Sequence, residues 1–265
     1  MSEQPIGVFD SGVGGLTVVA ALRQHLPQED ILYLGDTARV PYGTKSADTV
    51  RQYALKCGQF LRSRGSKAIV VACNTASAVG INNLRSELGM PVLGVIEPGC
   101  KEALRYTRNQ RIGVLGTPQT VRSAAYSTLI HQIEPQASVI SHACPLLVPL
   151  AEENMVSHPA TQLILDDYLT PMKSADIDTM VLGCTHYPLF QDLIESALGP
   201  GVHVVNSAEA VARSLMARLA VENLGTSKKA VGQVRVFLTD YHERVEAISH
   251  NFLKGNLPLF EHTDL

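Results

Sequence analysis

Short apolar segments alternate along the chain with longer segments in which apolar residues recur every three or four positions. The first kind is typical of buried strands and the second of amphipathic helices. In Leu16–Leu26, for example, Val18 and Leu22 share one face, and Pro27 follows as a stop signal. This alternation predicts parallel α/β sheets with helices on both faces. In the first part of the chain, strands are expected at Ile6–Phe9, Ile31–Leu34, Ala68–Ala72 and Val92–Ile96, and a second helix at Ala47–Arg64.

Three segments in the second part of the chain repeat the pattern and the order of three segments in the first part. Such a repeat indicates a duplicated topology. We therefore expect two similar parallel-sheet α/β domains, related by pseudo-symmetry, with the active site in the cleft between them. The matched segments are Arg111–Thr117 with Pro5–Ser11, the strand ending at Cys184 with the strand ending at Cys73, and Gly201–Ser207 with Pro91–Pro98.

The C-terminal tail does not fit the second repeat. A helix at Ala208–Leu224, a strand at Val234–Leu238 and a helix at Tyr241–Leu253 are expected there. We expect this tail to cross back and pack on the first domain. The predicted division is an N-terminal domain of residues 1–97 plus 207–265, and a second domain of residues 98–206, with tight joints near Pro98 and Asn206.

Composition and charge exclude several classes of protein. The chain has 265 residues, of which 45% are hydrophobic and 18% charged, as in ordinary globular proteins. A net charge of −3 gives no electrostatic reason to expect nucleic acid or a membrane as a partner. No apolar run approaches the roughly 20 residues of a membrane span. The segment Met1–Pro5 lacks the features of a signal peptide, and five cysteines form no framework, so reduced thiols in the cytoplasm are expected.

Two cysteines stand at the ends of matched strands, where parallel α/β sheets bind their ligands. A single cysteine is most simply a small buried apolar residue, which is the interpretation for Cys57, Cys100 and Cys144. A matched pair, Cys73 and Cys184, favours chemistry instead. One thiol on each side of a cleft could remove a proton from one face of a carbon and return it to the other. Each of the two also precedes a helix start, whose partial positive charge favours the thiolate.

Two polar loops follow the first two strands. The loop Asp10–Thr17 is rich in glycine and suits a cradle for a small anion, with Asp10 aimed at the cleft. Its alternative is a turn in which Asp10 or Ser11 caps the next helix. It is not the dinucleotide fingerprint, because Thr17 stands where the third glycine is required. The segment Gly35–Gly43 is long and polar, and is either a binding loop or an ordinary surface loop.

Further candidates lie near the second cysteine. His186 follows Cys184 by two residues and either tunes that thiol or caps a helix. Cys73, Cys184 and His186 lack the close ligand spacing of a zinc site, so no metal is expected. The pair Glu152 and Glu153 has the pattern of a solvated helix start.

Together these motifs resemble those of bacterial glutamate racemases, in the aspartate/glutamate racemase family. The resemblance extends from about Ile6 to Leu253. Aspartate and hydantoin racemases share the paired cysteines but not the combination of the first two loops. The motifs are Phe9–Val18, Tyr33–Gly43, Ala72–Ala76, Val95–Pro98 and Leu182–Pro188.

The resemblance implies a racemase that interconverts L- and D-glutamate without a cofactor and supplies D-glutamate for peptidoglycan. It implies that Cys73 removes the α-proton of the D enantiomer with help from Asp10, and that Cys184 removes that of the L enantiomer with help from His186. It also implies a cytoplasmic homodimer. The implied substrate-binding residues are Ser11, Pro41, Tyr42, Gly43, Asn74, Thr75 and Thr185, and the implied supporting carboxylates are Glu152 and Asp36.

Three other functions compete with this one. The protein could be a racemase for aspartate or another amino acid, or a decarboxylase of the malonate type, although the latter needs only one thiol. It could be a two-domain amino-acid binder of the periplasmic type, against which the two thiols and the missing export signal argue. A dithiol oxidoreductase would need Cα atoms within about 7 Å of each other, which leaves no room for a substrate.

Overall fold

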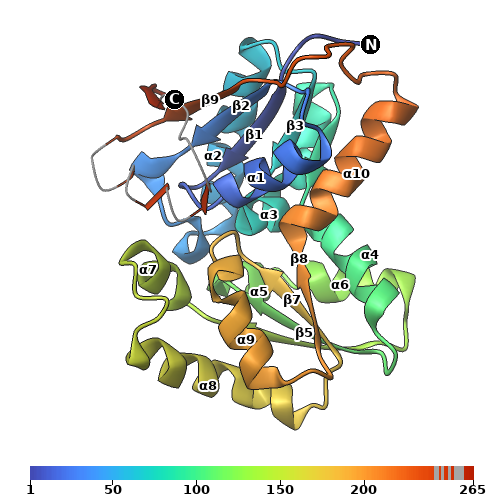
Figure 1. Cartoon of the computed structure of the whole chain (residues 1–265), viewed down its shortest axis with the longest axis vertical. Helices are drawn as coiled ribbons and strands as arrows, with labels where there is room; N and C mark the ends of the chain where they lie inside the picture. The colour runs from blue at the N-terminus through green and yellow to red at the C-terminus, as the bar shows by residue number, and fades with distance from the viewer. Residues whose placement is uncertain (242–244, 246–247, 250–251, 254–259) are drawn as a thin grey trace.

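The computed structural model describes residues 1–241, 245, 248–249, 252–253 and 260–265, which form two parallel-sheet α/β domains (Figure 1). The first sheet has the strand order β10-β9-β2-β1-β3-β4 and the second β6-β5-β7-β8. The strands of the first sheet are β1 (Ile6–Asp10), β2 (Ile31–Gly35), β3 (Ala68–Val71), β4 (Val92–Gly94), β9 (Val234–Leu238) and β10 (Phe260–His262). Those of the second are β5 (Arg111–Gly116), β6 (Ser138–Ala143), β7 (Thr179–Gly183) and β8 (His203–Asn206).

The two sheets share one topology. The order β2-β1-β3-β4 of the first matches β6-β5-β7-β8 of the second, and all the pairings are parallel. The predicted repeat is therefore confirmed, with β5 equivalent to β1, β7 to β3 and β8 to β4. In each sheet the order in which strands are added reverses between two neighbouring strands, β1 and β3 in the first sheet and β5 and β7 in the second. Doubly wound sheets bind their ligands in the crevice at this point.

Helices cover both faces of each sheet, as the apolar periodicity predicts. Side chains alternate along β3, so that Val70 packs with α1 and α10 while Ile69 and Val71 pack with α2 and α3. The second sheet lies between α8 and α9 on one face and α4 and α6 on the other. The helices are α1 (Leu16–His25), α2 (Ala47–Ser63), α3 (Asn74–Leu88), α4 (Ile96–Tyr106), α5 (Pro118–Arg122), α6 (Ala125–Ile133), α7 (Leu147–Glu152), α8 (Pro159–Ser174), α9 (Gln191–Leu198) and α10 (Ser207–Val221).

The strand predicted at Val92–Ile96 is too long. It ends at Gly94, and Ile96 already begins α4, with Glu97 in the first turn and Pro98 close behind it. A proline is accepted there because the first amides of a helix have no intrahelical partner.

The helix predicted at Tyr241–Leu253 falls largely outside the described residues.

The predicted strand Val234–Leu238 has the predicted bounds and pairs with β2 in the first sheet, with Val236 opposite Tyr33. Helix α10 packs against α1 and α4 (Figure 1). Arg213 of α10 donates to Glu102 of α4 at 2.7 Å. The domain division into 1–97 plus 207–265 and 98–206 stays a prediction.

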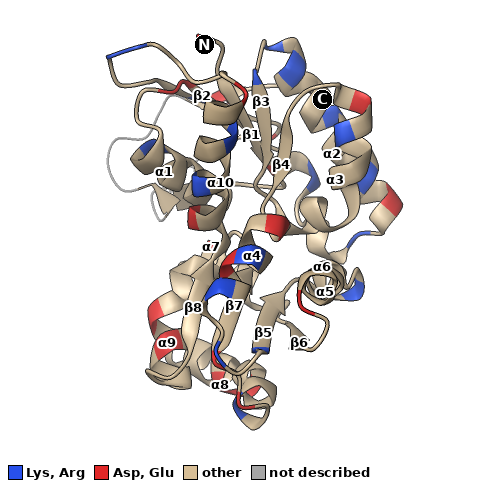
Figure 2. Ribbon diagram, turned by 90° about the vertical axis from the view of Figure 1, so that its right-hand side faces the viewer, with Lys and Arg blue, Asp and Glu red and all other residues tan. Residues whose placement is uncertain are grey.

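Basic and acidic residues are interspersed over both domains (Figure 2), as the small net charge of −3 suggests. In the part of the chain that is described, no helix combines the length and the apolar character that crossing a membrane requires. The candidate site lies where the carboxyl ends of strands from the two sheets meet.

Candidate active site

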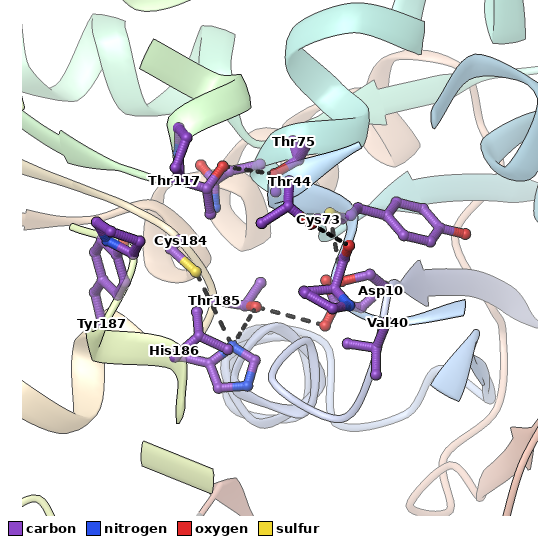
Figure 3. A pocket seen from close by; sticks show the side chains of 18 of the residues that line it. Asp10, Val40, Thr44, Cys73, Thr75, Thr117, Cys184, Thr185, His186 and Tyr187 are labelled. Atoms are coloured by element: carbon purple, nitrogen blue, oxygen red, sulfur yellow. Dashed lines mark hydrogen bonds between the residues drawn. The ribbon is translucent and has the colours of Figure 1, made fainter. Parts of the chain in front are cut away.

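The carboxyl ends of strands from both sheets meet at one pocket (Figure 3). The loops after β1, β2 and β3 line it from the first domain, and those after β5, β6 and β7 from the second. Figure 3 shows Cys73 and Asp10 on one side and Cys184 and His186 on the other. The two predicted thiols therefore line one pocket from different domains.

Most of the predicted site residues line this pocket, and their roles stay predictions. The loop Gly35–Gly43 contains a short 3-10 helix, Thr37–Arg39, and leads into a second, Tyr42–Thr44. Its second part, from Val40 onward, lines the pocket, so it is not merely a surface loop. The predicted residues on the pocket wall are Asp10, Ser11, Pro41, Tyr42, Gly43, Cys73, Asn74, Thr75, Cys184, Thr185 and His186.

Two predicted carboxylates lie behind this wall. Asp36 is fully buried and accepts hydrogen bonds from the hydroxyls of Tyr42 and Thr239, so it fixes the position of the Tyr42 side chain. Glu152 contacts His186 and lines a neighbouring hollow. It is the last residue of α7, so the predicted solvated helix start at Glu152 and Glu153 is wrong.

The sequence interpretation assigned no site role to several residues of the pocket, among them Thr117 and Cys144. The strand register explains both, because Gly116 pairs with Gly183 on one side and with Ala143 on the other. The residues that follow Gly116, Gly183 and Ala143 are Thr117, Cys184 and Cys144, so these three lie side by side at the ends of neighbouring strands. Cys144 is buried as predicted, yet it belongs to the wall. Thr117 had one sequence signal, its match to Ser11 after the equivalent strand.

Cys73 occupies the N-cap of α3, where its Sγ accepts from the Ala76 amide at 3.4 Å and faces the Ser11 hydroxyl at 3.9 Å. Burial and the charge of Asp10 raise the pKa of Cys73 to about 12 despite the amide. The predicted stabilisation of the Cys73 thiolate by the helix start is therefore outweighed. Near neutral pH this side chain is a thiol, ready to donate a proton.

Cys184 lies in a different environment. A turn at Thr185 and His186 and a 3-10 helix, Tyr187–Phe190, separate it from α9, so the helix predicted to follow directly begins later. Its Sγ lies 4.0 Å from Nδ1 of His186, whose Nε2 lies 3.2 Å from Oε1 of Glu152. His186 makes no capping bond with its side chain, so the capping alternative does not hold.

The buried imidazole of His186 is held in its charged form. Burial alone lowers its pKa, but the hydrogen bonds and charges of Cys184 and Glu152 together raise it to about 10. A positive charge therefore lies beside Cys184 at neutral pH, whereas Cys73 faces the carboxylate of Asp10. The two thiols have opposite electrostatic surroundings.

Asp10 carries an unsatisfied acceptor. It is 1% exposed, and its Oδ2 accepts from the amide of Gly15 at 2.9 Å and from the hydroxyl of Thr185 at 3.5 Å. Its Oδ1 is buried without a partner among the described residues. Burial raises its pKa, although the charge of His186 opposes this. Buried acceptors are almost always paired, so a donor from a ligand fits here.

The glycine loop approaches this site too closely for any side chain. A Cβ at Gly14 would lie 2.6 Å from Nδ1 of His186 and 2.6 Å from Oγ1 of Thr185. We expect Gly14→Ala to displace His186 and to lower kcat/KM about 100-fold, as misplacements near 1 Å do. The matched control is Gly80→Ala on α3, where the atom nearest to the new Cβ would be Cβ of Ala54, at an ordinary contact distance of 3.6 Å. Equal kcat/KM of the two variants, measured in the same activity assay, would contradict this.

Fold and site together define a class, that of two-domain α/β proteins with a pair of thiols at matched strand ends. Within this class the chain belongs to the Asp/Glu/Hydantoin racemase family, whose model matches residues 16–215. In the part of the chain that is described, no group of three or more His, Cys, Asp and Glu side chains is arranged to hold a metal ion.

Individual relatives agree with this family. Glutamate racemase of Syntrophus aciditrophicus is 46% identical over 261 residues, covering 98% of this chain and 97% of the relative. The structure of a glutamate racemase isoform from Bacillus anthracis has a TM-score of 0.96 at 37% identity, covering 100% and 99% of the two chains. Glutamate racemase from Francisella tularensis, solved with D-glutamate, has a TM-score of 0.94 at 35% identity, covering 100% and 98%.

Proposed function

We propose that this protein is a glutamate racemase that moves the α-proton between the faces of the substrate with Cys73 and Cys184. The observation that carries the proposal is the pair of thiols lining one pocket from equivalent strands, in opposite electrostatic surroundings. The Francisella tularensis relative binds D-glutamate. The proposed product supplies peptidoglycan synthesis.

The pocket offers complementary groups for an amino acid. The unpaired Oδ1 of Asp10 suits the α-ammonium, because a buried carboxylate oxygen gains most from a charged donor. The amide of Asn74 and the hydroxyls of Thr75 and Thr185 can donate to carboxylates. Ser11, Pro41, Tyr42 and Gly43 surround the same space. An amino acid with two carboxylates would use donors from both domains.

The difficulty of the reaction lies in the weak acidity of the α-proton. Removing it leaves negative charge on the α-carbon and its carboxylate, which fixed donors must stabilise in a site that excludes water. The donors here lie at strand ends and at the start of α3, so they are oriented before the substrate arrives. The buried positions of Cys73 and Cys184, 4% and 7% exposed, keep water from both sulfur atoms.

The asymmetry of the two thiols supports Cys184 as the first base, and the family resemblance relates that base to L-glutamate. Cys184 starts as a thiolate beside the positive charge of His186 and becomes a thiol when its sulfur receives the α-proton, while Cys73 starts as a thiol and becomes a thiolate when it gives its proton to the opposite face. The C–H bond to one face breaks and a C–H bond to the other face forms. The thiols have then exchanged roles, and D-glutamate reacts in reverse.

The test is L-glutamate in D2O with the purified, reduced protein and no added cofactor. Optical activity and the α-proton NMR signal are followed together. Loss of both supports racemisation with exchange at the α-carbon. If neither changes, the proposal fails for glutamate, and the same assay with aspartate and other amino acids examines the related racemases. Binding without exchange would favour an amino-acid binder, and release of carbon dioxide a decarboxylase.

Glu152 is expected to set the alkaline limit of activity. Glu152→Gln removes one negative charge facing His186, whose other titratable neighbours are Cys184 and Asp10. The pKa of His186, now about 10, falls, and the imidazolium is lost at lower pH. The alkaline limb of kcat/KM for L-glutamate should move down by about one pH unit. The matched control is Glu153→Gln, for which an equal shift would contradict the assignment.

Two further predictions concern the protein in the cell. All five cysteines are free thiols, which supports a cytoplasmic location. Fractionation of cells that express the protein checks this location.

Homodimerisation stays a prediction from the family resemblance, and analytical ultracentrifugation checks the oligomeric state.

A further inference from the structure

One buried tyrosine of the second domain reaches the residue next to Cys73 in the first. Tyr126 of α6 is 2% exposed, and its hydroxyl donates to Oδ1 of Asn74 at 2.6 Å. Burial raises the pKa of Tyr126, so the hydroxyl keeps its proton and stays a donor. None of the sequence motifs includes this residue.

This bond fixes which end of the Asn74 amide is free. An asparagine side chain has an accepting oxygen and a donating nitrogen, and the two ends exchange places when the amide flips. Because Oδ1 accepts from Tyr126, Nδ2 is the end of the amide that can donate to another group. Among the described residues no group accepts from Nδ2, and Asn74 lines the pocket. The free donors of Asn74 are therefore available to a ligand oxygen.

The ring of Tyr126 is seated at the junction of the two domains. A Cβ at Gly183, the residue before Cys184, would lie 3.2 Å from Cε2 of the ring, and a Cβ at Gly99 of α4 would lie 3.6 Å from Cε1. The absence of side chains at these two glycines leaves room for the ring. Tyr126 thus touches the strand end that carries one thiol and bonds to the residue beside the other.

A second hydroxyl extends this connection. Ser207, at the start of α10, lies 3.4 Å from the Tyr126 hydroxyl and donates to the carbonyl of Leu182 in β7 at 3.2 Å. Since the Ser207 proton goes to Leu182, Ser207 does not donate to Tyr126. The Tyr126 hydroxyl lies much nearer to Oδ1 of Asn74, at 2.6 Å, than to Ser207, so its proton goes to Asn74. The chain of contacts runs from beside Cys73 to the strand that ends at Cys184.

We propose that Tyr126 is a positioning residue, which holds the Asn74 amide so that its N–H groups face a carboxylate of the substrate. The proposal rests on the racemase function and deepens it. A freed amide would present its oxygen to the carboxylate in part of the molecules, and binding would weaken. The reacting thiols themselves would be unchanged, so the effect falls on KM more than on kcat.

The test begins with Tyr126→Phe, which keeps the ring between the two glycines. We expect KM for both glutamate enantiomers to rise about tenfold, the ratio that corresponds to about 1.4 kcal/mol, with kcat within about twofold. Tyr106→Phe is the control, because that ring stacks on His203 at the amino end of β8, and its KM should not change. Calorimetric binding of D-glutamate gives a second readout.

A double-mutant cycle with Asn74→Ala separates positioning from a merely structural role. If Tyr126 acts through the amide, Tyr126→Phe should raise KM and Kd no further once Asn74 is alanine. An equal, additive rise in both backgrounds would overturn the proposal, as would an unchanged KM in the single variant. Racemisation by the unmodified protein in the same assay is the reference, so failure of the racemase function itself is recognised separately.

Discussion

Cys73→Ser and Cys184→Ser are each expected to lower kcat for glutamate racemisation by about 1,000-fold or more, because each removes one of the two proton-transferring groups. A serine hydroxyl fills nearly the same space but is a far weaker acid. Both thiols are almost fully buried, and neither forms a disulfide, so the fold should survive. Circular dichroism at one wavelength measures the rate, and the far-ultraviolet spectrum checks the fold.

Cys100→Ser is the matched control, since Cys100 is fully buried on α4 and outside the pocket. Its activity should stay close to that of the unmodified protein. Full activity in either Cys73→Ser or Cys184→Ser would rule out the two-thiol mechanism.

The single-thiol variants also examine the assignment of each thiol to one enantiomer. Cys73→Ser keeps the group that faces L-glutamate, so in D2O it should exchange the α-proton of L-glutamate without forming D-glutamate. Cys184→Ser should do the same for D-glutamate alone. Exchange of the opposite enantiomer in each case would reverse the assignment and leave the pair itself intact.

Periodicity and repetition in the sequence predicted the elements that bring this pair together. Strand ends are local features, and parallel strands deliver their carboxyl ends to one edge, so Cys73 and Cys184 could be paired before any contact was known. The loop after β1 was predicted for the same reason. Asp10 lines the pocket as expected, and the binding of an anion by the loop stays a prediction. The alternative in which Asp10 or Ser11 caps the helix is wrong, because the N-cap of α1 is Gly15, and the amide from which Asp10 accepts at this helix start is that of Gly15 itself.

The features that could not be predicted depend on contacts between distant segments. Cys144 and Thr117 join the pocket through the register of β5 with β6 and β7. Tyr126 meets Asn74 across 52 positions of sequence. The pKa of Cys73 followed burial rather than the helix start, and burial is a property of the whole fold. Local patterns give the elements, whereas tertiary contacts determine electrostatics.

The end of the first sheet opposite to the site should control stability. Lys67 and Glu29 precede β3 and β2, and their side chains, 1% and 3% exposed, form an ion pair at 2.6 Å. Lys67 also donates to the carbonyl of Ser2, and Glu29 accepts from the amide of Thr226. We expect Lys67→Met to lower the free energy of unfolding by about 3–5 kcal/mol, because Glu29 is left charged and buried without its cation.

Urea denaturation measures this loss, which is a large part of the roughly 5–15 kcal/mol of a typical domain. Lys101→Met is the control: it breaks the pair with Glu97 on the surface of α4, where both side chains are largely hydrated, and should change stability little. Equal losses in the two variants would contradict the buried pair's role. Lys67→Met should keep its kcat per folded molecule, because the carboxyl ends of the strands are untouched. Stability and chemistry would then lie at opposite ends of the same strands, with Lys67 before β3 and Cys73 after it.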